Sequence, residues 1–235
     1  MKALILAAGF GSRLRPLTNK IPKALVKYKG RELIDYQISV LVSQEIKEIT
    51  LVVGYQAQIL KDFLEKKYSS LQIKIIENKE FGSSNSAFSA CKAIQESDLE
   101  EHLHINCDIL FSKKILSKII HSDESNILAV RKDLQFNDSM ENVISIGDRI
   151  VNMSTRNTSL SSYKAFGLAK ISAQALSVNL KKYENLSEIQ QRKENYFGLI
   201  RMALGEIDYK LIEGDKFNLA EINSLEDLET NVFKL

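Results

Sequence analysis

The stretch Leu6–Val26 reads LAAGFGSRLRPLTNKIPKALV and directly follows a short aliphatic run. Such a run is typical of a buried strand, and the strand opens into a loop at Gly9. Gly9 and Gly11 allow the backbone to approach a ligand closely, while Arg13 and Lys23 supply the positive charge that phosphates require. Because open α/β sheets bind ligands at the carboxyl ends of their strands, the stretch predicts a polyphosphate site.

Two familiar phosphate-binding motifs do not fit this loop. The dinucleotide fingerprint needs a third glycine where Leu14 stands, and the P-loop needs a Gly-Lys-Ser/Thr sequence that the loop lacks. The pair Gly9 and Gly11 is weak evidence by itself, since turns account for most such pairs. The longer sequence Leu6–Val26, rather than the glycine pair, is therefore the specific evidence for a phosphate site.

Composition limits the classes of protein that remain. The 235 residues are 44% hydrophobic and 26% charged, which is typical of a folded globular chain rather than a disordered one. A net charge of +2 is too small to attract nucleic acid or a membrane over the whole surface. With no signal-peptide pattern and no apolar run of spanning length, we expect a cytoplasmic protein without nucleic-acid or membrane partners. Cys91 and Cys107 have no zinc-site spacing and are expected to be small core residues.

Strand-like and helix-like segments alternate up to about residue 125. Strands are expected at 48–53, at 73–76 and in a segment that ends at Asp108, with helices at 34–42, around 59–64 and over 87–94. This alternation predicts an α/β fold with a Rossmann-like, mixed and mostly parallel sheet flanked by helices.

The pattern changes at Asn126. Hairpin strands are expected at 142–146 and 150–153, then a strand at 166–171, two helices, and a strand-turn-helix from Lys210. No internal repeat or linker-like composition interrupts the chain. We therefore expect a single domain over residues 1–235, with a nucleotide-binding half at about 1–125 and an acceptor-side half at about 126–235.

The string at 6–26 resembles LAAGxGxRLxPLTxxxPKxLV, the signature of the nucleoside-triphosphate transferase family typified by sugar-phosphate nucleotidyltransferases. The resemblance continues at Asn106-Cys107-Asp108, at Gly167 and at 220–228. It implies the nucleotide-diphospho-sugar transferase type of fold. It further implies a nucleotide-binding loop made by Leu6, Ala7, Ala8, Gly9, Gly11 and Ser12, catalytic Arg13 and Lys23, and metal ligands Asp108 and Asn223.

The residue chemistry agrees with a magnesium cofactor. Mg²⁺ prefers one or two carboxylates together with phosphate oxygens, and Asp108 follows a strand. Ser112 is better placed than Asp108 to cap the next helix. For Asn223 two interpretations stay open, a metal ligand or a residue that merely precedes the capping box of Ser224 and Asp227. The other candidate ligands, His102 and His104, are interpreted instead as a partly buried or edge pair of one strand.

Two departures from the sugar-type pattern bear on the substrates. The segment 78–86 replaces a glycine-rich turn and is similar to that of phosphocholine and aminoalkylphosphonate cytidylyltransferases. Ala165 stands where sugar-type relatives carry a glutamate, a loss for which Glu194 or Glu221 is a candidate substitute. The chain has no tryptophan, so a site for a cationic acceptor would use tyrosines, among them Tyr183. The predicted base-binding residues are Asn78, Ser84, Asn85 and Ser86, and the predicted acceptor-binding residues are Arg156, Tyr163, Tyr196 and Glu221.

The predicted function is therefore a magnesium-dependent cytidylyltransferase of cell-surface polysaccharide biosynthesis. It would transfer CMP from CTP to the phosphate or phosphonate of a small, phosphocholine-like acceptor and release pyrophosphate. One alternative is a sugar-1-phosphate nucleotidyltransferase that uses UTP, GTP or dTTP. Another is a non-catalytic nucleotide-binding regulatory module, against which the intact Arg13, Lys23 and Asp108 argue.

Overall fold

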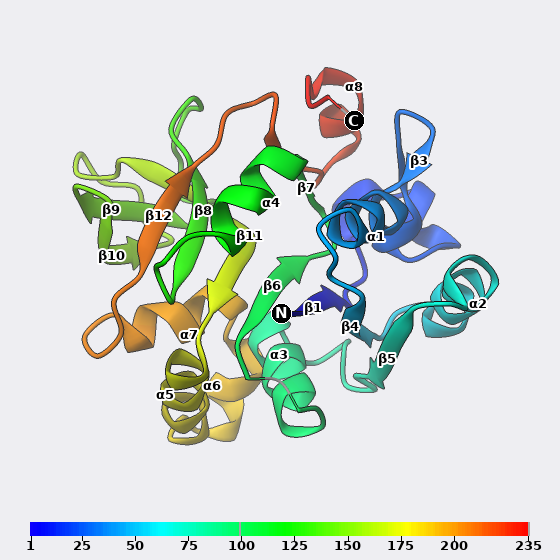
Figure 1. Ribbon diagram of the computed structural model, residues 1–235, viewed down its shortest axis with the longest axis horizontal. Helices are drawn as coiled ribbons and strands as arrows, with labels where there is room; N and C mark the ends of the chain where they lie inside the picture. The colour runs from blue at the N-terminus through cyan, green and yellow to red at the C-terminus, as the bar shows by residue number, and fades with distance from the viewer. Residues whose placement is uncertain (99, 235) are drawn as a thin grey trace.

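A nine-stranded mixed sheet forms the centre of residues 1–98 and 100–234, the part of the chain that the computed structural model describes (Figure 1). Its strands in chain order are β1 (Lys2–Ala7), β4 (Glu48–Val53), β5 (Gln72–Glu77), β6 (His102–Asn106), β8 (Ile127–Arg131), β9 (Asn142–Ile146), β10 (Arg149–Ser154), β11 (Tyr163–Ile171) and β12 (Lys210–Glu213). Two small ribbons accompany it, β2 (Lys27–Tyr28) with β3 (Arg31–Glu32) and β7 (Ile109–Phe111) with β13 (Leu219–Glu221).

The strand order is β5-β4-β1-β6-β11-β8-β12-β10-β9. The first four strands pair in parallel, and β11 then pairs antiparallel with β6. β11 also pairs antiparallel with both β8 and β9, and its pairing with β8 shifts register between Ala165 and Ala169. One sheet thus carries strands from both predicted halves of the chain, and the predicted mixed α/β sheet is confirmed.

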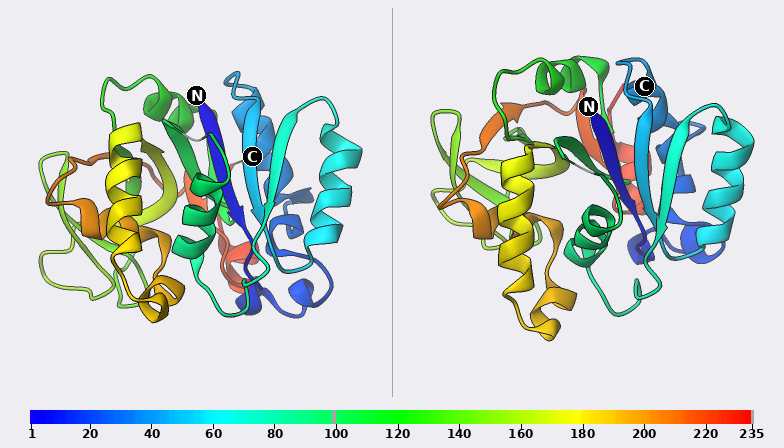
Figure 2. Two further views of the ribbon diagram at one scale, coloured as in Figure 1. Left: turned by 90° about the horizontal axis from the view of Figure 1, so that it is seen from below. Right: turned by 60° about the horizontal axis from the view of Figure 1, so that its bottom comes forward.

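Helices cover both faces of this sheet (Figure 2). On one face lie α1 (Leu33–Val42), α2 (Ala57–Tyr68) and α4 (Lys113–Ile120), and on the other α3 (Ser86–Gln95), α5 (Ala173–Glu184) and α7 (Tyr196–Ala203). Side chains of a strand alternate between its two faces. In β1, Ile5 accordingly joins the core under α1, and Leu4 joins the core under α3. The unbroken aliphatic run of β1 therefore reflects burial on both faces.

The segment between β11 and β12 differs from the prediction, since it holds three helices rather than two. The additional helix is α6 (Glu188–Lys193). Ser187 begins it with a capping box to Gln190, and Asn195 begins α7 by accepting a hydrogen bond from Gly198. The predicted final strand-turn-helix likewise contains two strands, β12 and β13, before α8 (Leu225–Thr230).

The predicted position of the two strand histidines is wrong. β6 lies between β1 and β11 rather than at an edge, so that His102 is 1% exposed and His104 is 0% exposed. Cys91 and Cys107 are free and buried, as expected. Among the residues that the structure describes, no helix has the length and apolar character needed to span a membrane.

The C-terminal segment returns to the N-terminal half and brings a second strand end to the site. β13 pairs antiparallel with β7, and the Ile222 amide donates to the Asp108 carbonyl at 2.9 Å. Farther along, the Tyr28 hydroxyl donates to the carbonyls of Asn231 and Phe233. These contacts place the residues that follow β13 beside the end of β6.

Candidate active site

A cavity of about 510 Å³ opens at the carboxyl ends of β1 and β6, and residues from both halves of the chain line it. A volume of this size is typical of small-molecule sites. Most of the predicted site residues line this cavity, namely Leu6, Ala8, Gly9, Gly11, Ser12, Arg13, Lys23, Asn78, Ser84, Asn85, Ser86, Asp108, Tyr196, Glu221 and Asn223.

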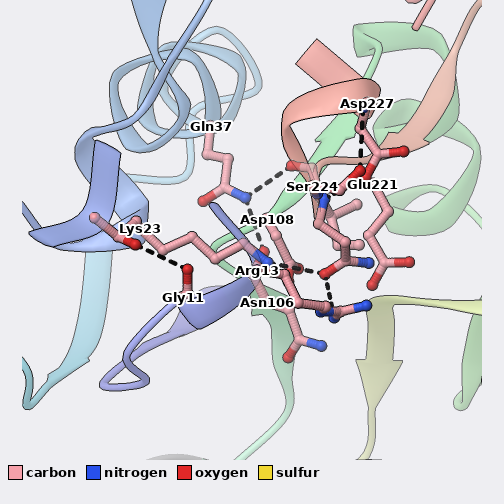
Figure 3. Close-up of polar contacts among 12 residues, drawn as sticks. Gly11, Arg13, Lys23, Gln37, Asn106, Asp108, Glu221, Ser224 and Asp227 are labelled. Atoms are coloured by element: carbon pink, nitrogen blue, oxygen red, sulfur yellow. Dashed lines mark hydrogen bonds and ion pairs between the residues drawn. The ribbon is translucent and has the colours of Figure 1, made fainter. Parts of the chain in front are cut away.

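Four charged or polar side chains converge at one end of the cavity. The Lys23 ammonium lies 2.6 Å from Oδ2 of Asp108 and donates to Oδ1 of Asn223 at 2.9 Å. Nη2 of Arg13 donates to the same Asn223 oxygen at 2.7 Å. Figure 3 shows Lys23 reaching from the N-terminal loop toward Asp108, with Arg13 beside them. The two cations of the loop thus face the end of β6, 85 residues away in sequence from Lys23.

Gly11 is the position at which this loop requires glycine. Its φ is +63°, and a Cβ built there would lie 2.9 Å from Cβ of Lys23. The Thr18 hydroxyl donates to the Gly11 carbonyl at 2.9 Å and fixes the turn. A side chain at this position would be strained and would push Lys23 away from the cavity.

Both Lys23 and Glu221 are charged in this site. Burial opposes the charge of Lys23, but the acidic groups around it, Asp108 foremost, together raise the lysine pKa above its usual value. Burial likewise favours the neutral acid at Glu221, but Lys164 foremost, together with Lys23 and a hydrogen bond from Asn223, lowers the glutamate pKa. The site therefore holds a fixed pattern of cations and carboxylates at neutral pH.

The residues at the end of β6 fit a hard divalent cation. Oδ1 of Asp108 is buried and has no hydrogen-bond partner among the described residues, while its other oxygen accepts from Lys23. The Asn223 amide oxygen faces the same place, and such oxygens together with phosphate are the ligands that Mg²⁺ takes. An orphaned buried carboxylate oxygen is costly unless a ligand satisfies it.

Side chains hold the backbone around both Asp108 and Asn223. The Asp227 carboxylate accepts from the amides of Asn223 and Ser224, at 2.7 and 2.8 Å, within the capping box of α8. The Gln37 amide donates to the carbonyls of Asn106 and Ile109 and so spans the turn that contains Asp108. The two interpretations of Asn223 are therefore compatible, because the capping box fixes its backbone while its amide oxygen faces the cavity.

The predicted base-binding cluster is more strongly bonded to the protein than expected. The Asn78 amide donates to the hydroxyls of Ser84 and Ser89, and the Asn85 side chain caps α3. The Ser86 hydroxyl accepts from the Tyr196 amide at 2.8 Å. In these bonds the oxygens of Ser86 and Ser89 accept, so each hydroxyl still has its hydrogen to donate to a ligand.

Further bonds tie the start of α3 to residues 192–196, which run from the end of α6 to the start of α7. The Asn85 amide donates to the Arg192 carbonyl at 2.8 Å, and the Ala87 amide donates to the Glu194 carbonyl at 3.3 Å. The Asn85 side chain adds a bond to the Lys193 carbonyl. Structural capping thus accounts for Asn85 and the bond to Tyr196 for Ser86, while the Ser84 hydroxyl donates to the Glu80 carbonyl at 2.8 Å.

Several predicted residues lie outside the cavity lining. Ala7 faces the core as the last residue of β1 and is 3% exposed. Arg156 is exposed beyond β10, the fourth strand from β6 in the sheet, and Tyr163 lies at the start of β11. Tyr183 is buried in α5, where its hydroxyl donates to the Gln191 carbonyl. Of the tyrosines considered for a cationic acceptor, Tyr196 alone lines this cavity.

Sequence reasoning missed part of the cavity wall. The sequence could have predicted Ser89 as a lining residue, because it lies three residues after Ser86 and hence on the same side of α3. Lys164, whose ammonium pairs with Glu221 across 57 residues, leaves no local pattern. The lining residues that were not predicted are Phe81, Ser89, Asn106, Cys107, Asn195 and Phe197.

The comparison with known proteins agrees with this site. A family model described as nucleotidyl transferase matches residues 2–136, which include the glycine loop, Lys23 and Asp108. The chain belongs to the nucleotidyl transferase family. Membership confirms the resemblance that the sequence at 6–26 predicted.

Individual relatives extend the similarity over the whole chain. CTP:phosphoglutamine cytidylyltransferase from Campylobacter jejuni is 30% identical over 257 aligned residues, which cover 100% of both proteins. Choline-phosphate cytidylyltransferase from Streptococcus pneumoniae is 42% identical over 89 residues, or 38% of this chain and 37% of the relative. Among solved structures, the inositol-1-phosphate CTP transferase from T. maritima superposes with a TM-score of 0.82 at 23% identity, covering 98% of this chain and 92% of that one. The last comparison confirms the fold.

Proposed function

We propose that this nucleotidyltransferase transfers CMP from CTP to the phosphate or phosphonate of a small acceptor and releases pyrophosphate. The observation that carries the proposal is the convergence of Lys23, Asp108 and Asn223 at one end of a cavity that both halves of the chain line. The choice of CTP is supported by the full-length similarity to a cytidylyltransferase.

The reaction needs positioning and charge neutralisation rather than a general base. An oxygen of the acceptor's phosphate attacks the α-phosphorus of CTP in line, the bond from that phosphorus to the bridging β-phosphate oxygen breaks, and pyrophosphate takes the electron pair. Because the attacking oxygen is already largely ionised at neutral pH, no proton has to be removed. Lys23 and Arg13 would hold the phosphates and offset the charge that develops on them.

We propose Mg²⁺ as the metal, with Asp108 and Asn223 as its ligands. When bound there it would neutralise phosphate charge and help to align the nucleotide for attack. The Lys23 ammonium, which now bridges the two side chains, would then be shared with the phosphates.

The acceptor would lie against Tyr196 and Glu221. Of the two carboxylates considered as substitutes for the glutamate missing at Ala165, both form ion pairs, Glu221 with Lys164 and Glu194 with Arg201, but Glu221 lines the cavity and Glu194 does not. A carboxylate and an aromatic ring in the same cavity lining favour an acceptor with an amine, amide or hydroxyl at the end opposite its phosphate. Phosphorylated amines and amides and aminoalkylphosphonates belong to this class.

A pyrophosphate-release assay tests the proposal. CTP, UTP, GTP and dTTP are each paired with phosphocholine, phosphoglutamine, 2-aminoethylphosphonate and two hexose 1-phosphates, with EDTA in place of Mg²⁺ as the control. We expect CTP with a small nitrogen-containing acceptor to give the highest kcat/KM, and EDTA to stop turnover. A higher kcat/KM for a hexose 1-phosphate with any nucleotide would show a sugar-1-phosphate nucleotidyltransferase instead. Cytoplasmic location and a role in cell-surface polysaccharide biosynthesis stay predictions.

A further inference from the structure

Asn106 occupies the middle of the cavity floor. It is the last residue of β6, the strand between β1, which leads into the glycine loop, and β11 of the acceptor-side half. Its side chain lines the cavity two residues before Asp108. The strand order therefore places Asn106 between the proposed nucleotide site and the proposed acceptor site.

A buried histidine sets the orientation of this amide. Nε2 of His104 lies 3.0 Å from Oδ1 of Asn106, while Nδ1 of His104 is buried without a partner among the described residues. With the proton on Nε2, the ring donates to the amide oxygen and leaves only a lone pair unpaired at Nδ1. The other tautomer would leave an N–H group unpaired in an apolar core, which is the rarer and costlier arrangement. The histidine thus holds the amide oxygen and turns the Asn106 NH₂ group away from itself.

The Asn106 side chain also packs against β11 of the acceptor-side half. A Cβ added to Gly167 on β11 would lie 2.3 Å from Nδ2 of Asn106, so that glycine is what allows the amide to lie across this strand. The His104 ring stacks on the ring of Tyr196, with 1° between their planes. Burial lowers the pKa of His104 well below its usual range, so the ring is neutral and adds no charge beneath the cavity.

We propose that Asn106 is a binding residue for the acceptor, that its Nδ2 donates hydrogen bonds to an oxygen of the acceptor's phosphate or phosphonate, and that His104 is its positioning residue. This inference rests on the proposed function. An NH₂ group donates and cannot accept, so it complements an anionic oxygen rather than an ammonium or hydroxyl proton. Its contacts with Gly167 and, through His104, with Tyr196 place it with the acceptor rather than with the base.

Steady-state kinetics on Asn106→Asp tests the donor. The variant keeps the shape of the side chain, retains an oxygen for His104 and replaces the NH₂ group by an oxygen that repels phosphate. We expect the KM for the acceptor to rise about 10- to 100-fold, as for loss of a hydrogen bond to a charged group, with the KM for CTP changed less than about threefold. Asn106→Leu removes the donor without adding charge and is likewise expected to raise the acceptor KM.

The matched control is Asn179→Asp, a buried amide on α5 outside the cavity, which is expected to leave the acceptor KM unchanged. His104→Phe keeps the aromatic stack on Tyr196 but removes the proton donor, and should lower kcat/KM for the acceptor about tenfold while the thermal midpoint holds. The ¹⁵N shifts of His104, assigned by their loss in His104→Phe, are expected to show the proton on Nε2. A proton on Nδ1 would overturn the orientation on which the inference depends.

The outcomes separate this inference from the proposed function. Absence of turnover by the unaltered protein with every nucleotide and acceptor would reject the proposed function. Turnover by the unaltered protein together with an unchanged acceptor KM in Asn106→Asp, or a larger rise in the KM for CTP than for the acceptor, would reject the role of Asn106 alone.

Discussion

Replacing Lys23 by alanine removes the group that links the loop to Asp108 and Asn223. Its ammonium contacts Asp108 at 2.6 Å and Asn223 at 2.9 Å, and only 11% of the lysine side chain and 16% of the aspartate side chain are exposed. Removal of one preorganised donor from a developing transition state lowers kcat by about 10²- to 10³-fold. We expect Lys23→Ala to lose that much activity.

The same structure predicts a separate effect on stability. Without the ammonium, the nearly buried Asp108 carboxylate lacks its partner, at a cost of about 2–3 kcal/mol in the absence of a metal ion. For a chain of this length that cost corresponds to a fall in Tm of about 4–12 °C. Thermal unfolding in EDTA measures it, and added Mg²⁺ should recover part of the loss because the cation takes over the carboxylate.

The assay is pyrophosphate release at saturating CTP and acceptor. The matched control is Lys20→Ala, which removes the same charge from an exposed position of the same loop and is expected to keep full activity. The reasoning fails if Lys23→Ala keeps more than about half of the activity, since the group would then make no contact specific to the transition state.

The remaining predictions concern the metal, the turn at the end of β6 and the response to acid. Asp108→Ala is expected to abolish magnesium-dependent turnover. Asn223→Asp should largely preserve it, because a carboxylate oxygen can still accept hydrogen bonds from Arg13 and Lys23. Magnesium titrations of the two variants check both expectations. Gln37→Leu leaves two carbonyls without their donor and should cost about 1–3 kcal/mol in urea unfolding, with a higher Mg²⁺ requirement for turnover if the turn loosens. Burial disfavours the Asp35 carboxylate, but its hydrogen bonds, the Lys67 bond foremost, lower its pKa below the usual 3.8. The ionised Asp35 carboxylate therefore stabilises the fold above pH 3.8, and this contribution is lost as the pH falls through the lower folded-state pKa. Urea midpoints of Asp35→Asn should accordingly fall less steeply on acidification than those of the unaltered protein.

The elements that the sequence predicted are those with a physical pattern in a single segment. After their first residues, β1 and β4 are buried on both faces and are almost entirely apolar, and the amphipathic helices show apolar residues at helical spacing. β7, β13 and the β2-β3 ribbon were missed, because strands of two or three residues are too short to show a period. Their existence depends on tertiary pairing.

The same distinction holds for the candidate site, where residues in a local sequence motif were predicted and residues brought together by the fold were not. The loop cations and Asp108 were found because each lies in a motif directly after a strand. Arg156 and Tyr163 were misplaced because a loose resemblance does not fix strand register, and a shift of one residue turns a side chain to the other face of the sheet. The pairing of Lys164 with Glu221 joins two strands whose approach only the fold determines.

The bonds between the start of α3 and residues 192–196 bear on how the acceptor preference of this chain can be re-engineered. The segment that carries Tyr196 is attached through its backbone to Asn85, Ser86 and Ala87. A chimera that exchanged residues 126–235 alone would cut through these attachments and place a foreign partner on α3. The unit to transplant from a relative is therefore discontinuous, the acceptor-side half together with the start of α3, and crossover points belong outside both segments.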